Sequence, residues 1–306
     1  MAATLPMSPI SHQLCRSSSK FWNNAWTPRF CSPIISISPC LIGLTSVGSA
    51  CQLRARHPLI CSAVTTNSLL HDVGATVAVL GGAYALVLSF ESLTKRNVIP
   101  QSLSRKLVHI LSGLLFVLSW PIFSESTEAR YFAAFVPLVN CLRLVVNGLS
   151  VSPNSTLIKS VTREGRPEEL LKGPLFYVFA LLVSVLFFWR DSPTGMMSLA
   201  MMCGGDGIAD IMGRKFGSEK LPYNTRKSWA GSISMFIFGF FISIGLLYYY
   251  SSLGYLQVNW ETTFMKVAMV SLVATVVESI PITDQLDDNV SVPLATILAA
   301  YVAFGY

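Results

Sequence analysis

The sequence predicts an all-α, polytopic integral membrane protein with seven or eight transmembrane helices and its polar site loops on one face. Its 306 residues are 52% hydrophobic and only 12% charged, and the mean hydropathy is +0.55. That composition is too apolar for an ordinary soluble domain. After about residue 72, apolar stretches that approach the ~20 residues of a spanning helix alternate with polar loops.

The first 63 residues differ in composition from the rest. They contain no Asp or Glu and are rich in Ser, Thr and Pro, as in SHQLCRSSSK and CSPIISISPC. This composition is typical of a plastid transit peptide, so we expect residues 1–63 to be cleaved and residues 64–306 to form a single membrane domain. Five of the 22 Lys and Arg residues lie in this leader, which leaves a nearly neutral body and no basic surface for nucleic acid.

Eight apolar stretches follow the leader, although seven spans is the alternative count. We expect helices over residues 73–90, 107–123, 130–149, 173–189, 194–212, 230–250, 264–280 and 290–305. With eight spans, thirteen Lys and Arg residues fall on the loops of one face and three on the other. Because positive loops stay on the side of insertion, we expect the first face to be stromal or cytosolic. Every loop that mixes acids with bases lies on that face, which favours a site for a charged, water-soluble partner at one membrane surface.

The segment GGDGIADIMGRKFG places two carboxylates beside an apolar stretch. A charged group at mid-bilayer costs roughly 2.5–3.5 kcal/mol on insertion scales. Asp206 and Asp210 share one face of a continuous helix, where their oxygens suit Mg²⁺ with phosphate oxygens as further ligands. Gly205 and Gly207 would let backbone N–H groups approach phosphate, and Arg214 would offset its charge. We expect the span to end or break at the glycines; the alternative is an Asp-capped helix end followed by a flexible basic loop.

Three other loops supply polar residues on the same predicted face. These residues are Lys106 and His109 in SRKLVHI, Glu169 and Lys172 in EELLKGPL, and Lys227 in RKSWAGS. Cations at span ends are often interfacial anchors, and a histidine one turn into a span is either a core residue, a phosphate contact or a proton acceptor. The common face of these loops is what favours a site.

Two further features indicate a polar interior. Arg143 needs a partner within its span, and Glu278 lies at a similar predicted depth, so we expect the two to pair. The loop PITDQLDDN adds Asp288 as another carboxylate, although a loop rich in Asp and Asn is by default a turn.

As an ordered set, RKLVH, ELLKGP, GDGIADIMGRKFG, KSWAGS and ESIPITDQLDDN resemble the polyprenol kinase family, which includes dolichol kinases and is related to CDP-lipid cytidylyltransferases. The resemblance covers the chain after about residue 68 and is closest to the plant plastid members that act on phytol. The sequence has no G-x-x-x-x-G-K-[ST] motif, so phosphate transfer here would proceed without a P-loop.

The resemblance implies a kinase that uses CTP, with UTP as a second donor, to phosphorylate phytol taken from membrane lipid, for tocopherol synthesis in a chloroplast membrane, the envelope rather than the thylakoid. It implies catalytic roles for Asp206, Asp210 and His109, and Mg²⁺ ligands at Asp206, Asp210 and Asp288. It also implies nucleotide or phosphate contacts at Lys106, Glu169, Lys172, Gly205, Gly207, Arg214 and Lys227.

Three alternatives remain at this stage. A farnesol or geranylgeraniol kinase would use the same headgroup chemistry. A CDP-lipid cytidylyltransferase would direct attack at the α-phosphate and release pyrophosphate. A non-enzymatic plastid membrane carrier would need acidic groups accessible from both faces.

Overall fold

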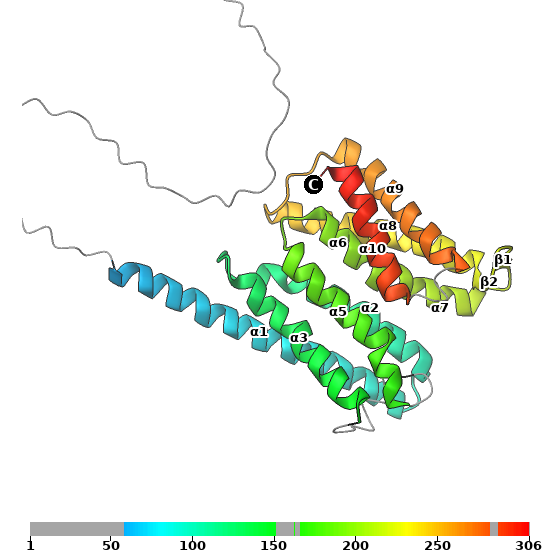
Figure 1. The fold of residues 1–306 in the computed structure, drawn as a ribbon, viewed down its shortest axis with the longest axis horizontal. Coiled ribbons are helices and arrows are strands. Elements are labelled where there is room, and N and C mark those ends of the chain that lie inside the picture. Colours follow the sequence, from blue (N-terminus) through cyan, green and yellow to red (C-terminus); the bar gives the residue numbers. More distant parts are fainter. Residues whose placement is uncertain (1–57, 151–161, 163–165, 282–286, 306) are drawn as a thin grey trace, which may run out of the picture. The chain divides into compact units, whose positions relative to one another are not determined.

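The computed structural model describes residues 58–150, 162, 166–281 and 287–305. Its elements are α1 (Pro58–Lys95), α2 (Gln101–Ser119), η1 (Trp120–Ile122), α3 (Ala129–Gly148), η2 (Pro167–Leu171), α5 (Gly173–Phe187), α6 (Pro193–Leu199), η3 (Ala200–Asp206), α7 (Gly207–Phe216), β1 (Lys220–Leu221), β2 (Asn224–Ser228), α8 (Trp229–Ser252), α9 (Trp260–Ser279) and α10 (Asp288–Phe304). The helical bundle in Figure 1 confirms the all-α prediction, with a small hairpin as the exception.

Each of the eight predicted spans overlaps one helical segment. Within the described residues, six helices are long and apolar enough to cross a membrane, and α10 is a shorter apolar helix. The remaining segment is α6, η3 and α7, which run without a break from Pro193 to Phe216. Most of the leader lies outside the described residues, and α1 already includes residues 58–63, which the leader prediction had assigned to the transit peptide.

The span that carries Asp206 does not break at its glycines, which corrects the sequence expectation. The chain instead widens into the π-helical turn η3 and continues as α7. The glycines allow close helix packing: a Cβ at Gly204 would lie 2.3 Å from Ile242 Cδ1 of α8, and one at Gly207 would lie 2.3 Å from Ile110 Cγ1 of α2. Two neighbouring helices therefore press directly on the backbone that carries the carboxylate.

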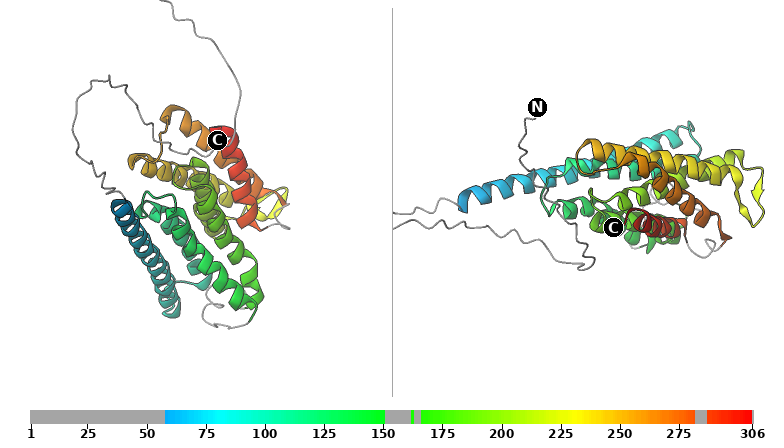
Figure 2. Two further views of the ribbon diagram at one scale, coloured as in Figure 1. Left: turned by 60° about the vertical axis from the view of Figure 1, so that its left-hand side comes forward. Right: turned by 90° about the horizontal axis from the view of Figure 1, so that it is seen from above.

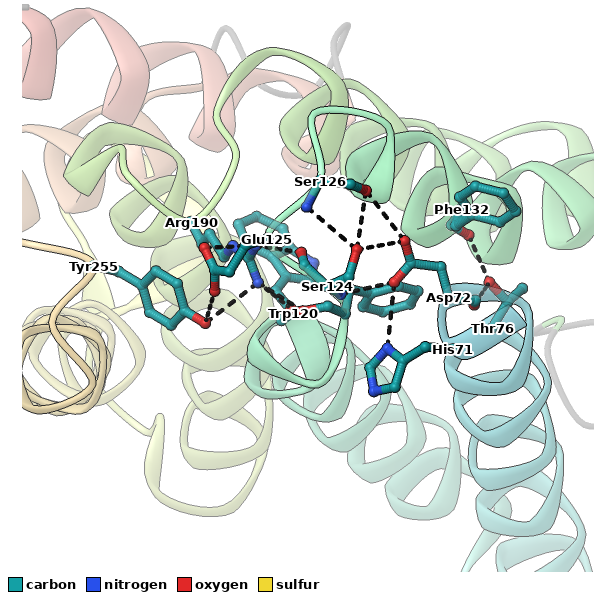
Figure 3. A network of polar contacts seen from close by, with 11 residues as sticks. His71, Asp72, Thr76, Trp120, Ser124, Glu125, Ser126, Phe132, Arg190 and Tyr255 are labelled. Carbon is teal, nitrogen blue, oxygen red and sulfur yellow. Dashed lines mark hydrogen bonds and ion pairs between the residues drawn. The ribbon is translucent and has the colours of Figure 1, made fainter. Parts of the chain in front are cut away.

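Three loops meet at the end of the bundle drawn in Figure 3, where Ser124 contacts both Asp72 and Arg190. The Asp72 carboxylate of α1 accepts hydrogen bonds from the Ser124 backbone N–H and hydroxyl, both at 2.7 Å. The Arg190 guanidinium, from the loop between α5 and α6, donates to the carbonyls of Phe123 and Ser124 and to the hydroxyl of Tyr255, which lies between α8 and α9. These contacts fasten α1 and three interhelical loops to one another.

Burial makes this network costly to disturb. Asp72 is 1% exposed and Arg190 is 4% exposed, so each charge depends on the hydrogen bonds that replace its lost hydration. Arg190 also lies over the rings of Trp189 and Tyr255, with its guanidinium carbon 5.3 Å and 4.7 Å from their centroids. The network therefore joins α1 and the loops at this end of the bundle through buried, hydrogen-bonded side chains.

The hairpin of β1 and β2 projects at the other end of the bundle (Figures 1 and 2). The helix α5 links the two ends, because Gly173 at its start contacts Asn289 of α10 while its last residues lead to Arg190. Its 15 residues span about 22 Å, which separates the two polar ends by most of a bilayer core.

We expect Asp72→Ala to lower the thermal unfolding midpoint, because it leaves the buried donors of Ser124 without their acceptor, at a cost of about 1–3 kcal/mol. The measurement is a thermal unfolding curve of the purified protein in detergent. The control is Glu91→Ala on the same helix, which removes only the i,i+4 pair with the exposed Lys95 and should cost far less. Equal midpoints for the two variants would contradict the structural role of this network.

Candidate active site

Three carboxylates meet at the end of the bundle that bears the hairpin. Asp206 ends η3, Glu278 lies in the last turn of α9, and Asp288 begins α10. Each offers one oxygen, and these oxygens lie within 4.8 Å of one another. We call these three residues the carboxylate group. Asp206 and Glu278 are buried and Asp288 is partly buried, so their mutual repulsion is weakly screened by water.

Two lysines approach the carboxylate group from different elements. Lys227 of β2 donates hydrogen bonds to Glu278 and Asp288, the latter at 2.9 Å. Lys106 of α2 places its Nζ 3.5 Å from an oxygen of Asp206. Burial alone would lower the pKa of Lys227, but the carboxylates of Glu278 and Asp288 outweigh it and raise that pKa above its usual value. Lys227 therefore stays protonated throughout the neutral range.

The donor atoms of the carboxylate group suit a hard divalent cation. Carboxylate oxygens are the ligands that Mg²⁺ prefers, and Mg²⁺ commonly takes one or two of them together with waters and phosphate oxygens. Asp288 Oδ1 is buried and has no hydrogen-bond partner among the described residues. An acceptor of this kind beside two other carboxylates fits a bound cation better than a closed salt bridge.

Asp210 belongs to a second charge group one helical turn further along α7. Its carboxylate pairs with Arg214 at 2.9 Å and lies 3.6 Å from Lys106 Nζ. Lys106 therefore touches both Asp206 and Asp210, which confirms that the two carboxylates share a helical face. The structure brings Glu278, and not Asp210, into the carboxylate group, so the role of Asp210 as an Mg²⁺ ligand stays a prediction.

A hollow of about 220 Å³ adjoins the second charge group. It lies between the first turns of α2 and the second half of α7 and is lined by Ser102, Leu103, Lys106, Asp210, Ile211, Arg214 and Lys215. Charged ends from Lys106 and Asp210 meet apolar walls from Leu103 and Ile211. The hollow is smaller than the 300–1,000 Å³ that encloses a drug-sized ligand, so it can hold only one end of a long molecule.

His109 lies beside the π-helical turn. Its Nε2 is 3.3 Å from the Met202 carbonyl, and because a carbonyl can only accept, Nε2 carries the proton in this contact. The ring also lies tilted against the ring of Tyr177, with centroids 4.0 Å apart, and the Tyr177 hydroxyl donates to the His109 carbonyl at 2.7 Å. A neutral ring held this way retains Nδ1 as its proton acceptor.

The segment EELLKGPL reaches the site through its glycine. Asn289 of α10 donates to the Gly173 carbonyl at 3.2 Å, and a Cβ at Gly173 would lie 3.1 Å from an oxygen of Asp287. Glu169 pairs with Arg166 at 3.8 Å, and Lys172 is exposed. The nucleotide-binding roles of Glu169 and Lys172 stay predictions.

The structure corrects two further expectations. Gly205 is buried with Met201 and Met235 against it, and Gly207 faces Ile110, so both serve helix packing in place of the expected approach to phosphate. Glu278 pairs with Lys227 and not with Arg143, whose guanidinium lies 5.9 Å from the ring centroid of Tyr84. The expected pairing of Arg143 with Glu278 was wrong because Lys227 reaches Glu278 from the hairpin. Hydropathy gives no signal for the position of that hairpin. Asp287, by contrast, has the structural role expected of an Asp in such a loop, because it caps α10 by accepting from the Asn289 N–H.

Comparison with known proteins places the chain. It is 83% identical over 308 residues to phytol kinase 1, chloroplastic, of Arabidopsis thaliana, and the match covers 100% of both chains. The chain belongs to the phytol kinase family. This confirms the resemblance to polyprenol kinases that the ordered motifs indicated.

Two other relatives of the phytol kinase family extend the match. Probable phytol kinase 1, chloroplastic, of Glycine max is 62% identical over 259 residues, covering 84% of this chain and 86% of that one. Probable phytol kinase, chloroplastic, of Triticum aestivum is 52% identical over 301 residues, covering 98% and 96%. No family model matches the chain, and no solved structure matches it significantly.

We expect Asp206→Asn and Glu278→Gln each to weaken divalent-cation binding at least tenfold, because each removes a charged oxygen ligand. Mn²⁺, which takes the same oxygen ligands as Mg²⁺, serves as the probe, and its binding to the purified protein is followed by electron paramagnetic resonance. Glu261→Gln, at the opposite end of α9, is the matched control.

Asp210→Asn separates the two possible ligand sets. Because Asp210 pairs with Arg214 outside the carboxylate group, this variant should bind Mn²⁺ nearly as well as the unchanged protein. A loss equal to that of Asp206→Asn would restore Asp210 as a ligand, and full Mn²⁺ affinity in Glu278→Gln would remove Glu278 from the set.

Proposed function

We propose that this protein is a CTP-dependent phytol kinase, which transfers the γ-phosphate of CTP to the hydroxyl of phytol and yields phytyl phosphate for tocopherol synthesis. One observation carries the proposal: a group of three carboxylates, two lysines and a nearby Arg lies at one end of a membrane bundle whose sequence is 83% identical to a protein named phytol kinase. This arrangement suits a reaction between a nucleotide from water and an alcohol from lipid.

The bilayer does part of the positioning. Burial of an isoprenoid chain in lipid is favourable by about 0.8 kcal/mol per CH₂, so the tail of phytol stays among acyl chains while its hydroxyl lies near the headgroups. The hollow between α2 and α7 is small enough to hold only that hydroxyl end. We place the alcohol there, with its first carbons against Leu103 and Ile211 and its oxygen near Lys106 and Asp210.

Charge neutralisation is the main task of the protein in phosphoryl transfer. Asp206, Glu278 and Asp288 would hold Mg²⁺, which when bound offsets charge on the nucleotide phosphates. Lys106 and Lys227, already beside these carboxylates, are within reach of a phosphate bound there, and Arg214 flanks the alcohol. The lysines thus lie where negative charge builds during transfer.

The alcohol must lose its proton late in the step. Asp210 lines the hollow in which we place the hydroxyl, whereas His109 lies in the layer behind it against Met202 and Tyr177. A weak base suffices, because the transition state of phosphoryl transfer is loose and the nucleophile keeps its proton until bond formation is advanced. We therefore assign the proton to Asp210 and leave His109 as a packing neighbour of the site.

The localisation follows the relatives. They are named chloroplastic, and the acid-free leader of this chain fits import into the plastid. We favour the envelope over the thylakoid, with the carboxylate group facing the stroma, and separation of plastid membranes with an antibody against the protein tests that choice.

The decisive experiment supplies membranes that contain residues 64–306 with Mg²⁺, phytol and γ-labelled CTP, UTP or ATP. We expect label in phytyl phosphate, most with CTP, less with farnesol or geranylgeraniol as acceptor, and none with Asp206→Asn. Labelled pyrophosphate with a CDP-lipid formed from a lipid phosphate of the membranes would establish a cytidylyltransferase. If the inserted protein formed no product, the membrane carrier would become the favoured function. The polar network around Ser124, at the opposite end of the bundle, argues against a carrier.

We expect Leu103→Trp to raise the KM for phytol about tenfold or more, because the larger ring fills the hollow, while the KM for CTP stays unchanged. The measurement is initial rate at varied phytol in detergent micelles. Leu111→Trp, an exposed position on the same helix, is the control. If the KM for CTP rose in place of that for phytol, the hollow would be a nucleotide subsite.

A further inference from the structure

The hairpin that carries Lys227 needs support beyond its own strands. Strand β1 has two residues and β2 has five, with Lys220 opposite Ser228 and Leu221 opposite Asn224. A lone two-stranded hairpin is at best marginally stable in water. A lysine on such an element holds a fixed place only when other parts of the chain anchor the hairpin.

The base of the hairpin is fastened to α8. The Ser228 hydroxyl caps this helix by accepting from the Gly231 N–H at 3.2 Å, and the Trp229 N–H donates to the Glu219 carbonyl at 3.1 Å. Both contacts lie where the strands meet the helices. They leave the tip to be held separately.

The tip is fastened to the last residue of α9. Asn224 Nδ2 donates to the Ser279 carbonyl at 3.0 Å, and Asn224 Oδ1 accepts from the Arg226 N–H at 3.1 Å. The Tyr223 hydroxyl lies 2.9 Å from the Ser279 hydroxyl. Because Ser279 already donates to the Val276 carbonyl, Tyr223 is the donor in this contact. We call these contacts of Tyr223 and Asn224 with Ser279 the clasp.

The clasp adjoins the carboxylate group directly. Ser279 follows Glu278 in the chain, and Lys227 lies three residues after Asn224 in the hairpin. The clasp thus lies close along the chain to both members of the pair formed by Lys227 and Glu278. Any displacement of the tip from α9 would move the Lys227 ammonium away from the carboxylates.

We propose that Asn224 and Tyr223 are positioning residues, which clasp the hairpin to the end of α9 and thereby set Lys227 against the carboxylate group for nucleotide binding. This inference rests on the proposed kinase function. Tyr223 is 54% exposed, so its ring fills no core space. Asn224 is 5% exposed, and its amide nitrogen bonds Ser279 while its amide oxygen bonds the Arg226 N–H. The two side chains therefore act through hydrogen bonds more than through packing.

The test compares Asn224→Ala and Tyr223→Phe with Thr225→Ala, an exposed neighbour in the same strand. We expect Asn224→Ala to raise the KM for CTP roughly tenfold, as loss of a buried hydrogen bond does, with a smaller rise for Tyr223→Phe, and no change in the KM for phytol. Thr225→Ala should match the unchanged protein. An unchanged KM for CTP in Asn224→Ala, in membranes where the unchanged protein makes phytyl phosphate, would overturn the inference and leave the kinase function intact.

A second variant separates positioning from general destabilisation. In a Lys227→Ala background, Asn224→Ala should add little to the KM for CTP, because the group that it positions is gone. A full additional effect would show that Asn224 acts by another route and would overturn the proposal.

A third readout does not depend on catalysis. Trypsin should cut after the exposed Arg226 faster in Asn224→Ala than in Thr225→Ala, because release of the tip exposes the strand to the protease. If the protein transferred no phosphate to any alcohol, this cleavage rate would still decide: faster cutting supports the clasp, and equal rates reject it.

Discussion

Mutual repulsion among Asp206, Glu278 and Asp288 is the constraint on which the functional end of the bundle depends. Three carboxylate oxygens within 4.8 Å, two of the residues buried, cannot all stay ionised unless positive charge lies among them. The fold answers with one lysine from each side: Lys106 arrives from a membrane helix and Lys227 from a hairpin outside it. Because the cations and the carboxylates come from five separate elements, the charges cannot be balanced until the whole end of the bundle has assembled.

The two ends of the bundle use burial in opposite ways. Around Ser124, the buried charges of Asp72 and Arg190 are each held by several hydrogen bonds to loop atoms. Around Asp206, the partners are long lysine side chains, and Asp288 keeps a buried acceptor oxygen that has no hydrogen-bond partner among the described residues. Fully satisfied polar groups favour one arrangement, whereas partly satisfied ones can exchange partners when a ligand arrives. This difference is what an enzyme that works from one membrane surface requires.

The sequence was sufficient for the order of the helices and for the face on which the polar loops meet, because both follow from hydropathy and the alternation of spans. It also placed Asp206 and Asp210 on one helix face and Lys106 on the same side of the membrane, but the contacts of Lys106 with both carboxylates came from the structure. It could not place Lys227 against Glu278, since that pair depends on a hairpin held by Asn224, a residue without any pattern of its own. Glu278 carried the signal of a lone acid in an apolar span, which pointed to a partner without identifying it. The glycines were misjudged because glycine serves close helix packing and phosphate approach equally well, and only the neighbouring Ile110 and Met235 decide between the two.

The π-helical turn at Ala200–Asp206 links the core of the protein to its site in a way that limits how either can change. Ahead of the turn, α6 is buried along its whole length; after it, α7 presents Asp210 and Arg214 toward the surface. Each residue advances an α-helix by roughly 100°, so removing one residue from this turn would swing the carboxylates round the helix axis while the core side chains stayed in place. The length of this seven-residue turn therefore fixes the direction in which the carboxylates point from the helix axis. Its apolar side chains can be exchanged for others of similar size, but an insertion or deletion there would turn Asp206 and Asp210 toward the wrong neighbours.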